Sequence, residues 1–297
     1  MFFDWYQGTI QDDAVTVLET LKKLGTETRV NDSIARMYHY KHGIQIHSNS
    51  GVVATVLFDG DKHPHAFATS DQAHTFAEVL REEWPDKHKV TRVDATQDFH
   101  EFGSYERLRK VCKTVAKDHK LKFPQYSDDI NPKAGRTQYV GSPKSDYRCR
   151  LYEKGYQVIG DIPQVKQGKV RAEDIPTWAD STGQIVNVDS WTRIELQVRP
   201  RHDDGKILAS TLTPDQVWAM SPWTLELAKK ALALNLEQVY IRQKRLSDDE
   251  KAFRAMCSQY GNILERLRVD LGDWQSLGLT IGETIKEIRN DEKKMGI

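Results

Sequence analysis

The stretch Thr91-Arg-Val-Asp-Ala-Thr-Gln-Asp98 returns later in the chain as Thr192-Arg-Ile-Glu-Leu-Gln-Val-Arg199. In both, an arginine comes two residues before a carboxylate, with a branched apolar residue between them. Because side chains alternate along a β-strand, the charged residues of each stretch share one face and the apolar residues share the other. The repeat predicts an α+β fold in which two related halves contribute strands to an antiparallel central sheet, with helices packed on the apolar face.

Two such strands side by side would bring the carboxylates of Asp94 and Glu195 together. Paired carboxylates among arginines suit a divalent cation, because hard oxygen ligands favour Mg²⁺ or Mn²⁺. The same pattern fits two cross-strand ion pairs, Arg92 with Glu195 and Arg193 with Asp94, which would stabilise a sheet and catalyse nothing. The residues alone leave both interpretations open.

Tyr152 lies in a second unusual run, Gly135-Arg-Thr-Gln-Tyr-Val-Gly-Ser-Pro-Lys-Ser-Asp-Tyr-Arg-Cys-Arg-Leu-Tyr-Glu-Lys154. Read as a strand, this run places Arg148, Arg150, Tyr152 and Lys154 on one face. The cations could hold a phosphate and favour the phenolate of Tyr152, which could then attack a phosphodiester. An edge strand whose tyrosine and arginines face water has the same pattern, so alternation does not decide between them.

Other residues of this run and the tryptophans are weaker candidates. Tyr139 precedes a turn, with no cation expected on its face. Gly141 and Ser142 fit a turn that contacts DNA and fit an ordinary hairpin equally well. Six tryptophans could stack on unpaired bases or could pack in a core: Trp5, Trp178, Trp191, Trp218, Trp223 and Trp274.

Composition sets loose limits on the protein. The 297 residues suffice for one large domain or two modest ones. The 43 basic and 43 acidic residues cancel, so the whole molecule has no net field to attract DNA or an anionic membrane. Basic residues nevertheless predominate from Tyr105 to Lys154, which indicates either a phosphate-binding surface or the solvated face of a helix over residues 104–121.

The cysteines and the hydropathy pattern indicate a compartment. Cys112, Cys149 and Cys257 are widely separated and form no Cys-x-x-Cys motif, which fits a reducing cytoplasm. The first residues have no basic leader pattern, and no segment is long and apolar enough to cross a bilayer. We expect a soluble cytoplasmic protein without a membrane partner.

Periodicity and turn residues predict the order of elements. Strands are expected over residues 2–10, 38–47, 52–58, 89–99 and 185–199 and around Tyr139 and Tyr152, and helices over 12–24, 70–83 and 104–121. Ser70 is expected to cap its helix, and Ser247 is expected to open a long helix through a capping box with Glu250. We expect two parts, a catalytic domain over residues 1–205 and a helical C-terminal region over 206–297.

Three motifs in order resemble the replication initiation factors of rolling-circle plasmids and filamentous phages. They are the stretch from Thr91 to Asp98, the run from Thr137 to Lys154, and Trp191-Thr-Arg-Ile-Glu-Leu196, and the resemblance spans about residues 88–200. It implies a relaxase-like enzyme that nicks one strand of a supercoiled double-stranded origin, leaves a 5′-phosphotyrosine and a free 3′-hydroxyl, and later rejoins the strand.

The resemblance assigns roles to particular residues. Tyr152 matches the nucleophile, and Asp94 and Glu195 match the acidic residues, which we expect to bind Mg²⁺ or Mn²⁺. From their chemistry, Arg150 and Lys154 would hold the phosphate or offset its developing charge. Family members often carry a His-hydrophobe-His metal motif, whereas this chain has His63-Pro64-His65, so the carboxylates are preferred as ligands. The expected DNA contacts are Arg92, Ser142, Lys144, Arg148 and Arg193.

The expected partners follow from this function. They are the origin DNA, the nicked single strand, the host helicase and polymerase, and a possible second copy of the chain, in the cytoplasm of a bacterium that carries a phage or plasmid. Two alternatives remain: a non-catalytic DNA- or RNA-binding protein with an RRM-like sheet, and a repressor or structural partner in which the charged strands form only ion pairs.

Overall fold

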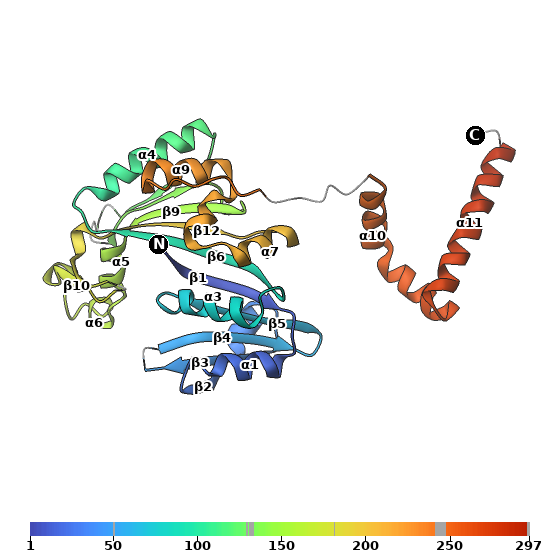
Figure 1. The fold of residues 1–297 in the computed structure, drawn as a ribbon, viewed down its shortest axis with the longest axis horizontal. Helices are drawn as coiled ribbons and strands as arrows, with labels where there is room; N and C mark the ends of the chain where they lie inside the picture. The colour runs from blue at the N-terminus through green and yellow to red at the C-terminus, as the bar shows by residue number, and fades with distance from the viewer. Residues whose placement is uncertain (50, 129, 131–133, 181, 241–247, 296–297) are drawn as a thin grey trace. The chain divides into compact units, whose positions relative to one another are not determined.

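The computed structural model describes residues 1–49, 51–128, 130, 134–180, 182–240 and 248–295 (Figure 1). Within these ranges, ten antiparallel strands form one sheet in the order β2-β3-β4-β5-β1-β6-β12-β9-β8-β7. The α+β class and the antiparallel sheet are therefore confirmed. The strands are β1 (Phe2–Ile10), β2 (Glu27–Val30), β3 (His42–Ser48), β4 (Gly51–Asp59), β5 (Lys62–Thr69), β6 (His88–Phe99), β7 (Gln125–Tyr126), β8 (Thr137–Val140), β9 (Tyr147–Glu153) and β12 (Thr192–Val198).

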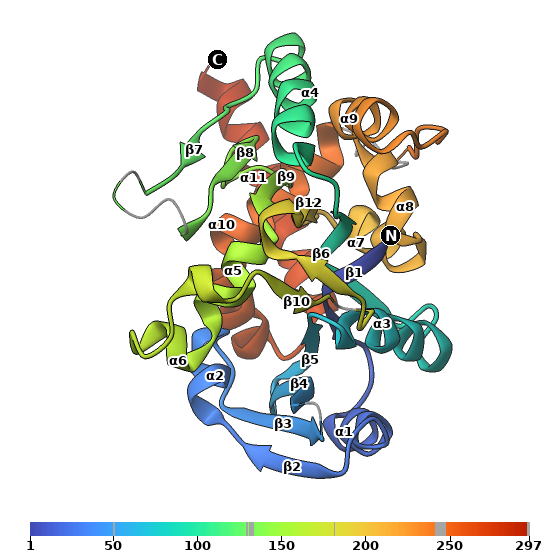
Figure 2. The ribbon, with the colours of Figure 1, turned by 90° about the vertical axis from the view of Figure 1, so that its left-hand side faces the viewer.

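Helices cover the apolar face of the sheet. Figure 2 shows α1, α3, α7 and α9 on one side of the sheet and α2, α5 and α6 on the other. Alternate residues of the central strands, such as Val93, Leu151 and Leu196, join one hydrophobic core with Phe76 of α3 and Leu108 of α4. The helices on the apolar side of the sheet are α1 (Ala14–Lys22), α3 (Gln72–Glu83), α4 (Ser104–Asp118), α7 (Asp203–Thr211), α8 (Pro214–Val217) and α9 (Pro222–Leu232).

The two related strands lie side by side, as predicted. β6 and β12 are antiparallel neighbours, and Ala95 lies opposite Leu196. These two residues also occupy equivalent positions in the repeated sequence. The register is therefore symmetric about this pair. Asp94 lies opposite Gln197 and Glu195 lies opposite Thr96, so the two carboxylates are diagonal neighbours across the strands.

Several predicted elements were wrong in their boundaries. The strand expected over residues 185–199 is interrupted by a 3-10 turn, Val188–Ser190, because the Asn187 side chain accepts a hydrogen bond from the Asp189 amide and bends the chain. Its first part, β11 (Ile185–Asn187), instead pairs with β10 (Thr177–Ala179) in a separate small sheet. The α3 helix begins after Asp71, and Ser70 adopts a left-handed conformation rather than capping it.

The region before β3 also differs from the prediction. A short helix, α2 (Asp32–Met37), capped by the Asn31 side chain, precedes Tyr38, so the strand begins only at His42. β2 and β5 were not predicted. β5 contains His63-Pro64-His65, which had been considered only as a metal motif.

The chain divides into two compact units, Met1–Arg242 and Gln243–Ile297. The helices α8 and α9 lie in the first unit, although they fall within the helical region expected from residue 206 onward, and α7 crosses the expected boundary. The second unit contains α10 (Asp248–Leu271) and α11 (Trp274–Met295). The expected cap at Ser247 lies outside the described residues. Among the described helices, none is long and apolar enough to span a membrane.

Candidate active site

Tyr152 lies near the end of β9, on the face of the sheet opposite the hydrophobic core. We define this surface as the polar face. Cross-strand register aligns three rows of residues on it: Asp98, Arg193 and Tyr152; Thr96, Glu195 and Arg150; and Asp94, Gln197 and Arg148. Two-residue alternation produces these rows, because Cys149 and Leu151 between the polar residues of β9 are buried in the core. The predicted face of Arg148, Arg150 and Tyr152 therefore exists.

Tyr152, Arg150 and Glu195 form a compact group. The Tyr152 hydroxyl donates a hydrogen bond of 3.4 Å to Oε2 of Glu195, and the same oxygen accepts a bond of 2.8 Å from the Arg150 guanidinium. That guanidinium also lies over the Tyr152 ring, 4.2 Å from its centroid. Tyr152 and Glu195 are buried, at 4% and 3% exposure. A tyrosine hydroxyl, a guanidinium and a carboxylate thus meet at one point.

The electrostatics of Tyr152 differ from the sequence-based expectation. Burial and the adjacent Glu195 carboxylate raise the pKa of Tyr152 well above that of a free phenol, although Arg193 and Arg150 oppose this effect. The expectation that cations would favour the phenolate was wrong, because the desolvation of a buried phenol outweighs their attraction. A raised pKa keeps the Tyr152 hydroxyl protonated, so any reaction that ionises it would require a proton acceptor.

Glu195 has an unusual protonation equilibrium. Burial and the neighbouring Asp94 carboxylate raise the pKa of Glu195 to about 7, while Arg150 lowers it. A carboxyl group that titrates near neutral pH can both accept and return a proton. The position of Glu195 beside the Tyr152 hydroxyl therefore meets the need for a proton acceptor.

Lys154 is near Tyr152 but is not part of its strand. β9 ends at Glu153, and Lys154 is the first residue of α5 (Lys154–Asp161). Its Nζ lies 5.9 Å from the Tyr152 ring centroid and donates to the Gln157 side chain. Burial and the nearby Arg193 lower the pKa of Lys154. The expected cation is present, but a helix start rather than strand alternation places it.

The two expected cross-strand ion pairs were wrong in their partners. Arg92 binds Asp94 on its own strand, with bonds of 3.0 and 2.5 Å. Arg193 binds both oxygens of Asp98, at 2.6 and 2.8 Å, and also Asp4 of β1. The register explains the difference, because Arg193 lies opposite Asp98 rather than Asp94. Arg193 is only 2% exposed, so contact with DNA would require these ion pairs to break.

Asp94 and Glu195 remain the candidate metal ligands on this face. Both side chains are hard oxygen donors. Burial raises the pKa of both carboxyl groups, and repulsion by Asp94 adds to this effect at Glu195. A divalent cation would reduce the cost of ionising them. Each already binds one arginine. Within the described part of the chain, no group of three or more His, Cys, Asp or Glu side chains could hold a metal. Asp94 and Glu195 would therefore supply two of the roughly six or more oxygens that such an ion takes.

The His63-Pro64-His65 motif lies elsewhere on the sheet. His65 is buried on β5, its Nδ1 lies 3.2 Å from the Thr9 hydroxyl, and burial lowers its pKa to about 4. Thr9 is four residues along β1 from Trp5, which is the neighbour of Asp94. The two histidines thus lie away from the carboxylate pair.

The other expected DNA contacts lie at different places. The Arg148 guanidinium lies over the Tyr139 ring at 3.7 Å, so Tyr139 has a cation on its face, contrary to expectation. Ser142 and Lys144 belong to the turn that joins β8 to β9, at the end of β9 opposite Tyr152. Gly141 in this turn has a φ of 95°, which explains the glycine. This turn therefore lies several residues along β9 from Tyr152.

Sequence reasoning missed a line of aromatic rings on the same face. We define the aromatic row as Trp5, Phe67, Tyr38, His65 and Tyr40. Neighbouring centroids are 5.4–6.0 Å apart and the planes differ by 8–34°. Arg92 lies over Trp5 at 3.9 Å, next to Asp94. The row escaped prediction because β5 and α2 were not recognised. Of its members, Trp5 is the one that is also among the six tryptophans predicted as base-stacking candidates.

Arg199 was also missed as a candidate contact. It lies one residue beyond β12 and is exposed, and its pKa is lowered by partial burial and by Arg92 and Arg148 nearby. Among the described residues, no carboxylate forms an ion pair with Arg148 or Arg199, and Nε of Arg148 is buried without a hydrogen-bond partner. Arg148 was already an expected DNA contact, and Arg199 follows from the same two-residue alternation that carries Arg193, Glu195 and Gln197 on β12.

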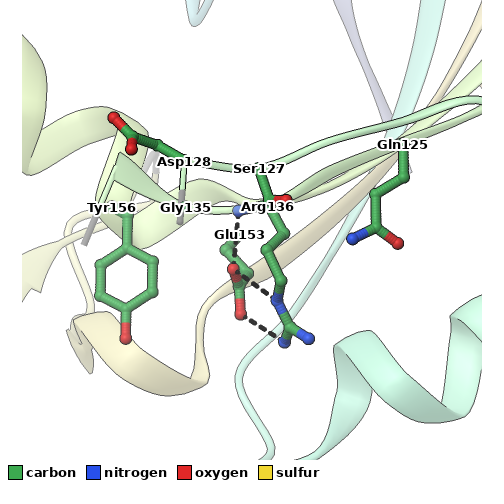
Figure 3. Close-up of a pocket in the computed structure, with 7 residues that line it drawn as sticks. All are labelled: Gln125, Ser127, Asp128, Gly135, Arg136, Glu153 and Tyr156. Carbon is green, nitrogen blue, oxygen red and sulfur yellow. Dashed lines mark hydrogen bonds and ion pairs between the residues drawn. The ribbon is translucent and has the colours of Figure 1, made fainter. Parts of the chain in front are cut away.

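A pocket of about 470 Å³ lies near the end of β9 but does not include Tyr152 (Figure 3). Its wall includes Glu153, which alternation directs away from Tyr152 and which binds Arg136 through both oxygens. Arg136 in turn contacts Glu106 and the Tyr105 ring of α4. The pocket is therefore separate from the polar face.

Comparisons with known proteins show a similarity in structure but none in sequence. No family model matches the chain, and no curated protein matches it. A solved structure to which the fold is similar is that of a rolling-circle replication initiator protein from Geobacillus stearothermophilus, with 21% sequence identity, 84% of this chain and 89% of that chain covered, and a TM-score of 0.45. The functional assignment of this chain therefore depends on its own residues.

Proposed function

We propose that the chain is a replication initiator that nicks and rejoins one strand of an origin through Tyr152. One observation carries this proposal: the Tyr152 hydroxyl, the Arg150 guanidinium and the Glu195 carboxylate meet within hydrogen-bonding distance on the polar face. The ordered motifs around Asp94, Tyr152 and Glu195, which resemble those of rolling-circle initiators, support the same function.

Glu195 would make Tyr152 nucleophilic. As the Tyr152 oxygen forms its bond to phosphorus, the hydroxyl proton passes to Oε2 of Glu195, which it already contacts. The bond between phosphorus and the 3′-oxygen breaks, leaving a 5′-phosphotyrosine and a free 3′-hydroxyl. Rejoining reverses these steps, and the proton returns from Glu195 to Tyr152. The phosphotyrosine conserves the bond energy, so no nucleotide triphosphate is required.

Arg150 and Lys154 would manage the charge of the phosphate. An anionic phosphodiester resists attack until its charge is offset, and Arg150 can exchange its bond with Glu195 for a bond to a phosphate oxygen. Lys154, whose pKa burial and Arg193 lower, is a better proton donor than an ordinary lysine. We assign to it the proton that the departing 3′-oxygen requires.

Asp94 and Glu195 would hold Mg²⁺ or Mn²⁺ together with the phosphate. When bound, such an ion supplies charge stabilisation at a non-bridging oxygen of the scissile phosphate. The chain contributes the two carboxylates, and Arg92 must release part of its bidentate contact with Asp94. Nicking in EDTA at the rate seen with Mg²⁺ would remove the metal from this proposal and leave Glu195 as the proton acceptor alone.

The rest of the polar face would hold the DNA. Arg148 and Arg199 have no carboxylate partner among the described residues and are suited to bind phosphates next to the scissile one. The aromatic row offers ring surfaces for unpaired bases. Ser142 and Lys144 would contact duplex DNA farther along. The biological partners would be a supercoiled origin, the host helicase and the host polymerase, in a bacterial cell that carries a phage or plasmid.

A matched pair of tyrosine variants tests the nucleophile. Supercoiled plasmid carrying the coding sequence and its flanking DNA is incubated with Mg²⁺ and wild-type, Tyr152→Phe or Tyr139→Phe protein. We expect relaxed circles and a covalent protein–DNA adduct on denaturing gels with wild type and Tyr139→Phe, and a loss of at least ~10³-fold with Tyr152→Phe. Equal nicking by Tyr152→Phe would refute the assignment.

A non-catalytic nucleic-acid-binding protein is the second candidate. The raised pKa of Tyr152 and the aromatic row both suit a surface that binds single strands without cleaving them. This function is favoured if all three proteins bind single-stranded DNA tightly and none of them forms an adduct.

A further inference from the structure

Thr96 carries a buried hydroxyl that makes no hydrogen bond to any described residue. Its side chain is 0% exposed, and its Oγ1 atom is inaccessible to solvent. A buried hydroxyl without a partner is unfavourable, because it loses its bonds to water and gains none from the protein. Valine has the same branched shape and would avoid this cost. A threonine at this position therefore indicates a second state in which the hydroxyl gains an acceptor.

The position of Thr96 on the sheet shows which acceptor is within reach. It lies on the polar face of β6, between Asp94 and Asp98 along the strand and directly opposite Glu195 of β12. Both oxygens of each aspartate already bind an arginine. The Phe2 side chain, opposite Thr96 on β1, has no polar atom. Directly opposite residues have Cβ atoms about 4.5–5.5 Å apart, so a bond from the hydroxyl to the Glu195 carboxylate is feasible.

Glu195 would lose its cation during the proposed reaction. Its Oε2 atom accepts a bond of 2.8 Å from Arg150 and one of 3.4 Å from the Tyr152 hydroxyl. Arg150 also has a donor to spare, because its Nε is buried without a partner in the described part of the chain. When Arg150 turns to a DNA phosphate, the buried carboxylate needs another donor to stay beside Tyr152.

We propose that Thr96 is a positioning residue, whose hydroxyl donates to the Glu195 carboxylate when Arg150 binds the phosphate. This inference rests on the proposed nicking function, because it concerns the same proton acceptor. Hydrogen bonds to an ionised acceptor are roughly twice as strong as bonds between neutral groups, so the new bond replaces part of the attraction lost with Arg150. It holds the carboxylate against the Tyr152 hydroxyl while the proton moves.

Two substitutions of Thr96 test this role in single-turnover nicking of supercoiled plasmid with Mg²⁺. Thr96→Val removes the donor, and we expect the nicking rate at saturating protein to fall at least ~10-fold while affinity for the plasmid changes by less than about twofold. Thr96→Ser keeps the donor and should nick within roughly fivefold of wild type. A Thr96→Val protein that nicks as fast as wild type overturns the role of Thr96 alone. The absence of an adduct with wild type overturns the nicking function and this role with it.

Urea unfolding separates this role from a purely structural one. Because the Thr96 hydroxyl is unpartnered among the residues that the structure describes, Thr96→Val should unfold at the same urea concentration as wild type or a higher one. Thr224→Val is the matched control, since Thr224 of α9 is equally buried but donates to the Ser221 carbonyl at 3.0 Å. This control should unfold at a lower urea concentration and nick like wild type. A lower urea midpoint for Thr96→Val would mean that the hydroxyl already has a partner without DNA, which contradicts the proposal.

The Arg150→Gln background tests the exchange of donors directly and without DNA. Removing the guanidinium frees the Glu195 carboxylate, so the Thr96 hydroxyl should bond to it in the unliganded protein. Thr96→Val should then lower the urea midpoint in the Arg150→Gln background, although it does not do so in wild type. Equal effects of Thr96→Val in the two backgrounds would show that Thr96 does not replace Arg150 as a donor.

Discussion

Glu195 determines what the other residues of the polar face can do. Its Oε2 atom binds both the Tyr152 hydroxyl and the Arg150 guanidinium, so the proposed nucleophile and the proposed phosphate-binding cation are linked through one oxygen. Burial, together with repulsion by Asp94, keeps its pKa near 7. A small change around Glu195 therefore changes the proton acceptor and the position of the cation at once.

Glu195 also predicts how stability depends on pH. Its folded-state pKa of about 7 is above the ordinary value of 4.5, so the folded state holds this proton more tightly than the unfolded state. The resulting stabilisation is complete below about pH 4.5 and is lost as the pH rises through 7. The Glu195→Gln variant has no carboxyl group at this position and does not lose this stabilisation. The difference in free energy of unfolding, variant minus wild type, should therefore rise by on the order of 2–3 kcal/mol between pH 5 and 8.

Urea unfolding in EDTA at several pH values measures this difference. Glu19→Gln is the control, because its exposed carboxylate pairs with Lys22, which stays charged from pH 5 to 8. A difference for Glu195→Gln that stays flat from pH 5 to 8 would mean that Glu195 is ionised throughout.

Sequence alternation predicted which residues share the polar face but not their environment. The period of two placed Arg148, Arg150 and Tyr152 together, since that property is local to one strand. The pairing of Tyr152 with a residue 43 positions away was not local. The neighbouring strand β12 buries Tyr152, and this burial raises the Tyr152 pKa instead of lowering it. The sequence of residues 147–153 does not specify that β12 is the neighbouring strand.

At the scale of elements, the junction of β9 with α5 positions the site. Tyr152 lies near the end of β9, and Lys154 is the first residue of α5. The position of Lys154 relative to Tyr152 therefore depends on how closely α5 packs against the Val188–Ser190 turn. Gly155 makes this approach possible: its amide donates to the Trp191 carbonyl, and a Cβ atom there would lie 2.1 Å from the Val188 carbonyl oxygen.

Two alanine substitutions in α5 should therefore have opposite effects. Gly155→Ala forces α5 away from the turn, and we expect a loss of about 1–3 kcal/mol or more in unfolding free energy and slower nicking. Gly160→Ala lies in the same helix with no atom within 4 Å of the added methyl group, and should be neutral or stabilising by up to about 1 kcal/mol. Thermal unfolding of both variants compares them, and equal losses would exclude the proposed close approach.

The long, strongly patterned elements were predictable, and the short ones were not. β1 and β6 were placed within a residue because each has a long alternating pattern. β5 and α2 were missed because a proline and two histidines interrupt the first and the second has only six residues. Short elements take their structure from neighbours, since their own propensities are weak.

At the scale of the whole molecule, equal numbers of acidic and basic residues leave local charge to attract DNA. The net charge of zero means that affinity depends on a few arginines rather than on a general field. The basic helix α4 carries many lysines, but the face that contains Tyr152 is on the other side of the sheet. We therefore assign the DNA-binding electrostatics to Arg148 and Arg199.

The salt dependence of binding tests this assignment. Binding of fluorescein-labelled oligo(dT) to the Tyr152→Phe protein should weaken as salt rises, with a slope of about −0.7 in log K against log[salt] for each phosphate contact. Arg148→Gln and Arg199→Gln should each reduce the slope by about 0.7. Lys113→Gln, on an exposed part of α4, is the control and should leave it unchanged. The opposite ranking would place the DNA on α4.

The symmetric register of β6 and β12 has a consequence for the strands on either side of them. Trp5 lies beside Asp94 as Arg150 lies beside Glu195, and Gln7 lies beside Arg92 as Tyr152 lies beside Arg193. The sheet thus contains two equivalent corners, as duplication of a half-length ancestor would leave, and only one carries a tyrosine. A DNA strand laid across this axis would meet Tyr152, the proposed nucleophile, on one side and the Trp5 ring on the other. Because the two corners carry different residues, only one 5′-to-3′ direction of the DNA strand would place its phosphate at Tyr152.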